Sequence, residues 1–351
     1  MHPRDRVARW LADALDAGAF PTASAAAGGP EHDLFRVEIP DPVGGRRVYD
    51  LASLTKVIGT TMAFLRLIDR GEIGLDDTVS KYVPAPADKA RITVLDLLRH
   101  TGGFEAHFLM DDATVPGGSA REHVLDAILH RPLAYAPGRD VIYSCIGFIV
   151  LGFILEIVAG APLDQVVREL VLRPLGMEHT GYDPTRWVAS PDAIIATERD
   201  PATGVALCGV VHDENARFLG GVAGNAGLFS CLDDCVTFGR LLLNRCAGFL
   251  SPELFDAMVR SWTPGLPDSR GLGLSLPGGS RPWPGGRIGD DAFGHTGFTG
   301  TSIFVSPSTD LFFVLLTNRV NYGRDLAAMP DYRARYHETV LQAVRPERVA
   351  R

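Results

Sequence analysis

Ser53 and Lys56 stand three residues apart in the segment YDLASLTKVIGTTMAFL, residues 49 to 65. A serine hydroxyl is a weak nucleophile at neutral pH and needs a base within hydrogen-bonding distance. A lysine can be that base when burial or a neighbouring cation lowers its pKa. Because residues three apart on a helix point the same way, the pair could carry out acyl transfer. The spacing alone is also compatible with a serine that caps a helix and a solvated lysine.

The pair must be positioned by a strand and a helix. A short strand-like run precedes Ser53, and residues 54 to 70 carry apolar side chains at helical spacing, ended by Gly71. Two earlier segments, residues 20 to 28 and 33 to 40, are short enough to be strands with a glycine and proline turn between them.

The middle of the chain is mostly helix and loop, whereas its end returns to strand character. Helices are predicted within residues 93 to 103, 146 to 160, 163 to 176 and 232 to 244, with Thr93 as an N-cap, and with Gly102 and Gly160 as helix stops. Residues 301 to 319 form two apolar runs around a Pro-Ser-Thr-Asp turn, which predicts an antiparallel hairpin. A final helix is expected over roughly residues 324 to 344.

This order of elements predicts an α+β fold. We expect an antiparallel sheet flanked by N- and C-terminal helices, plus an inserted, mostly helical domain. Residues 1–65 and 285–351 would form the sheet domain, residues 66–284 the helical domain, and a cleft between them the site. Residues 263 to 290 are dense in glycine and proline, which is typical of a site rim or of a poorly ordered loop.

Composition narrows the class of function. The chain has 351 residues, a net charge of -8 and a pI near 5.7 without basic clusters, so nucleic acid is not an expected partner. The N-terminus predicts an amphipathic helix rather than a secretion signal, and the apolar run 146 to 155 is too short to span a bilayer. We therefore expect a cytoplasmic protein without a membrane partner.

The five cysteines form no Cys-x-x-Cys pair, which fits reduced thiols. Cys231 and Cys235 would share a helix face, where packing is favoured over a metal site. The sequence contains neither the Gly-x-Ser-x-Gly elbow of α/β-hydrolases nor a His-x-x-x-His metal motif. No metal or cofactor is expected.

Several ordered segments resemble the serine β-lactamases of class C and the related penicillin-binding-protein-like esterases and acyltransferases. They are LASLTK at residues 51 to 56, TVLDLLRHTGG at 93 to 103, LRPLGMEHTGY at 172 to 182, VHDENARFLGGVAGNAGLFS at 211 to 230 and GHTGFTGTS at 294 to 302. APGRDVIYSCIGF, residues 136 to 148, is similar to the family segment that carries a Tyr-x-Asn motif. The resemblance covers nearly the whole chain and implies a β-lactamase/transpeptidase-like fold.

The resemblance also implies roles for particular residues. Ser53 would be the acylated nucleophile and Lys56 its activating partner, with Tyr143 as a second proton-transfer group whose phenolate the lysine ammonium favours. His295, Thr296 and Gly297 would replace the family's Lys-Thr-Gly strand. The backbone N–H groups of Ser53 and Phe298 would form the oxyanion hole.

Two positions depart from the family pattern. Cys145 stands where the Tyr-x-Asn motif has asparagine, so no amide is available there, which argues against β-lactam hydrolysis. Three hypotheses remain for this residue: a neutral packing substitution, a substrate-shaping residue or a second nucleophile. Asn225, grouped here with the substrate-binding residues, stands where esterase-like members usually have histidine.

The sequence predicts serine-dependent acyl transfer on a small-molecule ester, lactone or amide. The acyl acceptor would be water, an amine or an alcohol, including in a biosynthetic pathway. A catalytically silent binding module is the alternative, and a true β-lactamase or D,D-peptidase is a further one. The sequence does not indicate an oligomeric state.

Overall fold

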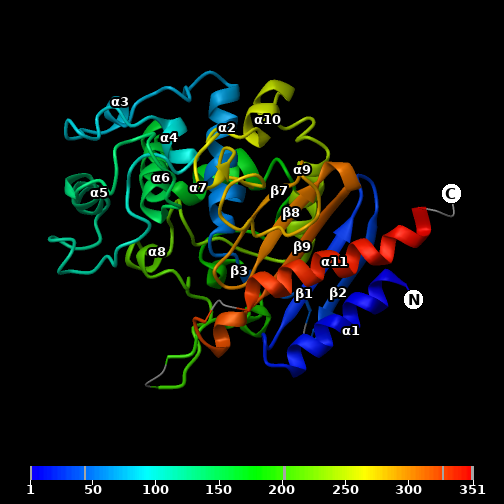
Figure 1. Ribbon diagram of the computed structural model, residues 1–351. Coiled ribbons are helices and arrows are strands. Elements are labelled where there is room, and N and C mark those ends of the chain that lie inside the picture. The colour runs from blue at the N-terminus through cyan, green and yellow to red at the C-terminus, as the bar shows by residue number, and fades with distance from the viewer. Residues whose placement is uncertain (1, 43–44, 201–202, 326–327, 349–351) are drawn as a thin grey trace.

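The computed structural model describes residues 2–42, 45–200, 203–325 and 328–348, and contains helices and strands in the order drawn in Figure 1. The helices are α1 (Pro3–Asp16), α2 (Met62–Asp69), α3 (Val79–Tyr82), α4 (Val94–Leu98), α5 (Arg121–His130), α6 (Cys145–Ala159), α7 (Leu163–Val167), α8 (Glu214–Phe218), α9 (Leu232–Leu243), α10 (Pro252–Val259) and α11 (Met329–Arg348). The strands are β1 (Ala23–Gly28), β2 (Asp33–Ile39), β3 (Tyr49–Asp50), β4 (Phe229–Ser230), β5 (Ser269–Arg270), β6 (Ser275–Leu276), β7 (Phe293–Thr296), β8 (Ser302–Ser306) and β9 (Leu311–Thr317).

A seven-stranded sheet in the order β2-β1-β9-β8-β7-β6-β5 forms the centre of the fold. Every neighbouring pair is antiparallel, and β1 from the start of the chain pairs along its whole length with β9 from the end, from Ala23 opposite Thr317 to Gly28 opposite Phe312. The predicted pairing of the two ends of the chain in one antiparallel sheet is therefore confirmed, as is the predicted hairpin of β8 and β9.

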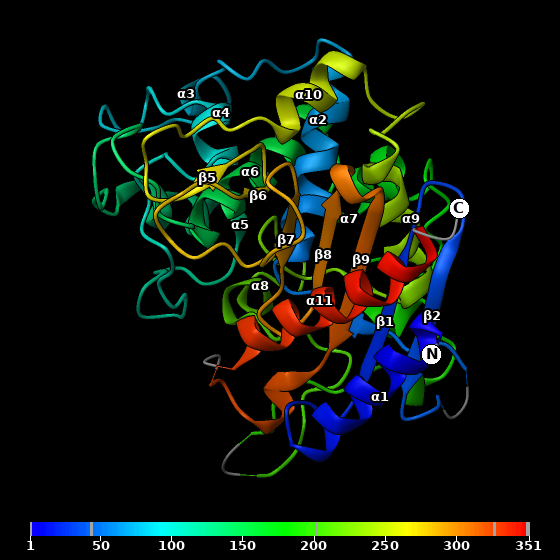
Figure 2. The same cartoon turned by 45° about the vertical axis from the view of Figure 1, so that its right-hand side comes forward.

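The sheet is covered on both faces. Helices α1 and α11 lie side by side on one face, and α9 packs against β1, β8 and β9 on the other (Figure 2). The sequence of β9 is apolar throughout because both of its faces are buried. Phe313 and Leu315 pack in the hydrophobic cluster under α1 and α11, whereas Phe312 and Val314 pack in the cluster on the other face of the sheet. A strand buried on both faces has no polar alternation.

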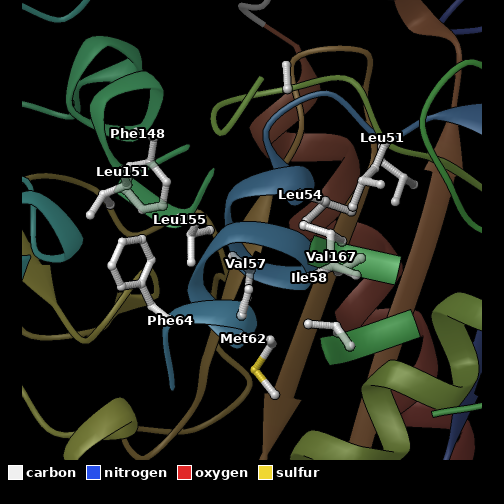
Figure 3. Packing of buried hydrophobic residues seen from close by; sticks show 14 of the residues in the cluster. Leu51, Leu54, Val57, Ile58, Met62, Phe64, Phe148, Leu151, Leu155 and Val167 are labelled. Atoms are coloured by element: carbon white, nitrogen blue, oxygen red, sulfur yellow. The ribbon is translucent and has the colours of Figure 1, made fainter. Parts of the chain in front are cut away.

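The helices from the middle of the chain form a second body of structure beside the sheet (Figure 1). Its core lies between the helical stretch after Ser53 and helix α6, where Val57 and Phe64 face Phe148 and Leu155 (Figure 3). The predicted helix over residues 54 to 70 consists of a π-helical segment, Lys56–Thr61, followed by α2. Such π-helical stretches are rare in proteins, and those that occur often lie at functional sites.

Two predicted helix ends differ in the structure. Helix α4 ends at Leu98 rather than at Gly102, and the left-handed residue after it is His100, with φ 63°. The final helix begins at Met329, because the chain first makes a short 3-10 turn at Arg319–Tyr322; residues 326–327 of the predicted helix lie outside the described residues.

The segment predicted to be mostly helical also contributes to the sheet layer. Strands β5 and β6 extend the sheet edge, and α9 covers one of its faces. The division at residues 65/66 and 284/285 stays a prediction. Among the described residues, no single helix is long and apolar enough to cross a membrane; α6 and the helical stretch Leu163–Leu172 reach that length only as a pair bent by 80°.

Candidate active site

Ser53 lies in a turn between β3 and the π-helical segment. Ala52, directly before it, has φ 47°, a left-handed conformation that non-glycine residues rarely adopt. The buried carboxylate of Asp50 holds this turn, because its oxygens accept hydrogen bonds from the backbone N–H of Ala52 at 2.8 Å and of His212 at 2.7 Å. The strained turn therefore directs the Ser53 side chain to one place.

Lys56 is fully buried and uses all three ammonium hydrogens. Its Nζ donates to Ser53 Oγ at 3.0 Å, to the carbonyl oxygen of Asn225 at 2.9 Å and to Cys145 Sγ at 3.4 Å. Burial lowers the pKa of Lys56, but the charge of the Cys145 thiolate, followed by the effects of Tyr143, outweighs burial and raises this pKa above its ordinary value. The direction favours an ammonium at rest, and the activating role of Lys56 stays a prediction.

Tyr143 brings a buried hydroxyl to the same place. The hydroxyl has no hydrogen-bond partner among the described residues, and Lys56 Nζ lies 5.1 Å from the ring centroid. Burial raises the pKa of Tyr143 and outweighs the opposite effect of Lys56. The expected influence of the lysine is present, but the phenol, not the phenolate, is favoured at rest.

His295 is a neutral acceptor on strand β7. Its Nδ1 lies 2.8 Å from the carbonyl oxygen of Thr296 and must donate to it, so Nε2 carries the lone pair. Burial, followed by the nearby charges of Arg270 and Lys56, lowers the pKa of His295 to about 3. Its ring centroid is 5.6 Å from that of Tyr143, so the two side chains are neighbours.

The turn after β7 packs directly against the turn that carries the serine. A Cβ on Gly297 would lie 2.5 Å from the Leu51 carbonyl oxygen, so only glycine allows this approach. Arg333 donates to the Gly297 carbonyl oxygen at 3.2 Å, and the Phe298 N–H points away from Arg333 because the peptide is planar and trans. Within the described residues, neither this N–H nor that of Ser53 has an acceptor.

A cavity of about 540 Å³ joins these groups. The predicted residues that line it are Ser53, Tyr143, Cys145, His295, Thr296, Gly297 and Phe298. Lys56 lies beneath Ser53. Asn225, grouped with the substrate-binding residues, does not line the cavity, because its buried amide donates to Asp213 Oδ1 at 3.1 Å; it acts on the site through its carbonyl oxygen and Lys56.

Among the cavity-lining residues that the sequence analysis did not single out, two bear on the charge of the site. Cys145 raises the pKa of His107, and Arg270 lies over the Tyr143 ring with 5.4 Å between guanidinium and centroid. The sequence spacing between these residues and the motifs does not indicate that they meet in the fold, because His107 lies in a loop after α4 and Arg270 in the glycine-rich segment. Burial raises the pKa of Cys145, but Lys56 and then His107 outweigh it, so the pKa of this thiol is lowered.

Comparison with known proteins identifies the family. The sequence profile described as Beta-lactamase matches residues 7–338. The chain belongs to the Beta-lactamase family. A relative from Escherichia coli (strain K12), named "Putative D-alanyl-D-alanine carboxypeptidase", is 36% identical over 300 residues, which is 78% of this chain and 69% of the relative.

Solved structures share the β-lactamase-like fold. A penicillin-binding protein homologue from Pyrococcus abyssi superposes with a TM-score of 0.75 at 20% identity, over 96% of this chain and 77% of the other. EstCE1, described as a hydrolase with promiscuous acyltransferase activity, gives a TM-score of 0.71 at 23% identity over 94% and 98% of the chains. These likenesses confirm the predicted α+β fold class.

Proposed function

We propose that this member of the Beta-lactamase family transfers acyl groups through an acyl-enzyme on Ser53. The donor is a small-molecule ester, lactone or amide, and the acceptor is water, an amine or an alcohol. The observation that carries the proposal is the contact of 3.0 Å between Lys56 Nζ and Ser53 Oγ at the base of the cavity. An ammonium buried against a serine hydroxyl at the edge of a cavity is an arrangement that can activate the serine as a nucleophile.

In the proposed reaction, Ser53 Oγ attacks the carbonyl carbon of the donor. Acylation starts from the form of the coupled Lys56 and Tyr143 pair in which Tyr143 has lost its proton to solvent. The Lys56 ammonium stabilises the negative charge that develops on Oγ, and the Tyr143 phenolate takes the proton of Ser53. The same pair returns a proton to the leaving group. The acceptor then attacks the ester on Ser53 by the reverse sequence of proton transfers.

The oxyanion is bound by the backbone N–H groups of Ser53 and Phe298 in this proposal. Both groups line the cavity and lack an acceptor in the described part of the chain, as donors reserved for a transition state must. The neutral His295 accepts a hydrogen bond through Nε2, which suits a hydroxyl or amine acceptor rather than a carboxylate. We place the protein in the cytoplasm, where esters and amides of small metabolites, including biosynthetic intermediates, are available.

Intact-mass measurement with a panel of activated esters, each with and without an added amine, tests the proposal. The panel includes an acyl-D-Ala-D-Ala peptide, because that is the substrate class in the name of the curated relative. We expect an acyl adduct on Ser53 that disappears faster when the amine is present. If a folded sample takes up no acyl group and no fluorophosphonate, the protein is the silent binding module instead.

A further inference from the structure

Cys145 differs from the other four cysteines of the chain, all of which the structure describes. Cys231, Cys235 and Cys246 are buried, and burial raises the pKa of each thiol. Cys208 is exposed, but burial of its sulfur and the charge of Asp192 raise its pKa as well. Cys145 alone among the five both lines the cavity and has a lowered pKa.

Three features favour a thiolate at Cys145. Lys56 Nζ lies 3.4 Å from Sγ, and the neighbouring His107 side chain also lowers the pKa of the thiol. Cys145 is also the first residue of α6, a helix of 15 residues, whose N-terminus stabilises an anion. Asp213 opposes these effects but does not cancel them. The proposed acyl transfer requires no chemistry from this thiolate.

His107 is oriented by a further side chain. Asn215 Oδ1 accepts from the Met110 backbone N–H at 2.9 Å and Nδ2 donates to the Phe108 carbonyl oxygen at 2.8 Å, which fixes the orientation of the amide. The same Nδ2 lies 3.3 Å from His107 Nδ1. Nδ1 is therefore the acceptor in neutral His107, and Nε2 carries the hydrogen.

Cys145 Sγ and the Ser53 hydroxyl contact the same ammonium group. Lys56 Nζ bridges the two, at 3.4 Å from Cys145 Sγ and 3.0 Å from Ser53 Oγ. The Tyr143 hydroxyl, buried and without a partner in the described residues, opens onto the same cavity. A substituent on the sulfur would occupy the cavity in front of Ser53 and would remove the anion that faces the Lys56 ammonium.

We infer that Cys145 is a modification site for small disulfides, and that its modification switches off acylation of Ser53. The thiolate attacks one sulfur of a disulfide RSSR, a Cys145–S–SR bond forms, and the S–S bond of the reagent breaks to release RS⁻. A small thiol reverses the reaction by the same exchange. The second half of this inference rests on the proposed function, whereas the first half does not.

Treatment with bis(2-hydroxyethyl) disulfide at pH 7 tests both halves, because this probe is small, neutral and reversible. Peptide mass analysis gives the rate at each cysteine, and fluorophosphonate uptake gives the reactivity of Ser53. We expect the mixed disulfide to form at Cys145 at least about tenfold faster than at Cys208. Fluorophosphonate uptake should fall in proportion to modification and return after treatment with a small thiol.

Two variants separate the contributions. Cys208→Ser removes the exposed thiol outside the cavity and should leave both the modification of Cys145 and the loss of Ser53 reactivity unchanged. His107→Gln should move the pH midpoint of Cys145 alkylation upward, because a side chain that lowers this pKa is lost. A merely structural role of His107 would leave that midpoint in place.

Each outcome has a distinct meaning. Preferential modification of Cys208, or none at Cys145, overturns the inference whatever Ser53 does. Complete modification of Cys145 with undiminished fluorophosphonate uptake overturns the switch. If the untreated protein takes up no fluorophosphonate, the proposed function fails, and the rate at Cys145 still decides the modification site.

Discussion

The two walls of the cavity are built from different chemistry. One wall consists of helix starts and carries the charged or nucleophilic groups Ser53, Lys56 and Cys145. The other wall is the sheet edge formed by β5, β6 and β7; at the end of β7, His295 is neutral and Gly297 brings two backbones together. In the proposed reaction, proton transfer therefore belongs to the helix wall, whereas the end of β7 fixes geometry and supplies neutral hydrogen bonds.

The largest expected difference in acyl-enzyme formation is between serine substitutions on the two walls. Ser53→Ala removes the nucleophile, so acyl-enzyme formation should fall by about 10³-fold or more. Ser275, on β6, lines the same cavity without a lysine beside it, and Ser275→Ala should retain the acyl adduct. Intact-mass analysis after mixing with an activated ester measures both. Activity that survives in Ser53→Ala and is lost in Cys145→Ala would make the thiol the nucleophile.

Cations on the two walls give the next comparison. Lys56→Ala removes the charge next to Ser53 Oγ and should slow acylation by about 10²- to 10⁴-fold. Arg270, on β5, also lies over the Tyr143 ring but pairs with Asp268, so Arg270→Ala should slow acylation much less. Stopped-flow release of a chromogenic leaving group gives the two rates. Equal losses would mean that the site needs positive charge in general, not at Ser53.

A third test breaks the contact between the walls. In Gly297→Ala the new Cβ would lie 2.1 Å from Thr301 Oγ1 and 2.5 Å from the Leu51 carbonyl oxygen, so the β7 turn must move away from the serine turn. We expect acylation to fall by about 10²- to 10³-fold through displacement of the Phe298 N–H, and unfolding free energy by about 1–3 kcal/mol.

Gly29→Ala is the control for that test. Its Cβ would find only the Asp310 carbonyl oxygen, at an ordinary 3.6 Å, so the protein should keep its acylation rate. Acylation kinetics and thermal unfolding are measured together for both variants. Unchanged acylation in a destabilised Gly297→Ala would remove Phe298 from the oxyanion proposal.

The fold and several residues that line the cavity could be predicted from the sequence, whereas the charge states of those residues could not. Patterns of apolar residues determine which segments pair, so the β1 and β9 pairing and the α6 helix were predictable. Charge states depend on distances between residues far apart in the chain: Lys56 and Cys145 are separated by 89 positions, yet their contact reverses the effect of burial on the lysine pKa. His107 was missed for the same reason, since only the fold brings its loop to the start of α6.

The smallest expected effect concerns two buried histidines on different sides of the molecule. Burial lowers the pKa of His295 to about 3 and that of His337, on α11, to about 4. Both pKa values lie below the ordinary 6.5 of an unfolded histidine, so between pH 6.5 and pH 4 the unfolded state binds a proton that the folded state does not. The stability contributed by each neutral histidine is complete above pH 6.5 and is lost as the pH falls.

Each histidine should therefore make unfolding free energy decrease by up to about 1.4 kcal/mol per pH unit in that window. His295→Gln and His337→Gln should flatten the dependence by similar amounts in urea denaturation at several pH values. Only His295→Gln should also slow acylation, because His337 contacts Gly285 under α11 and does not line the cavity. Equal acylation rates for the two variants would reduce His295 to a packing residue and leave catalysis to the helix wall alone.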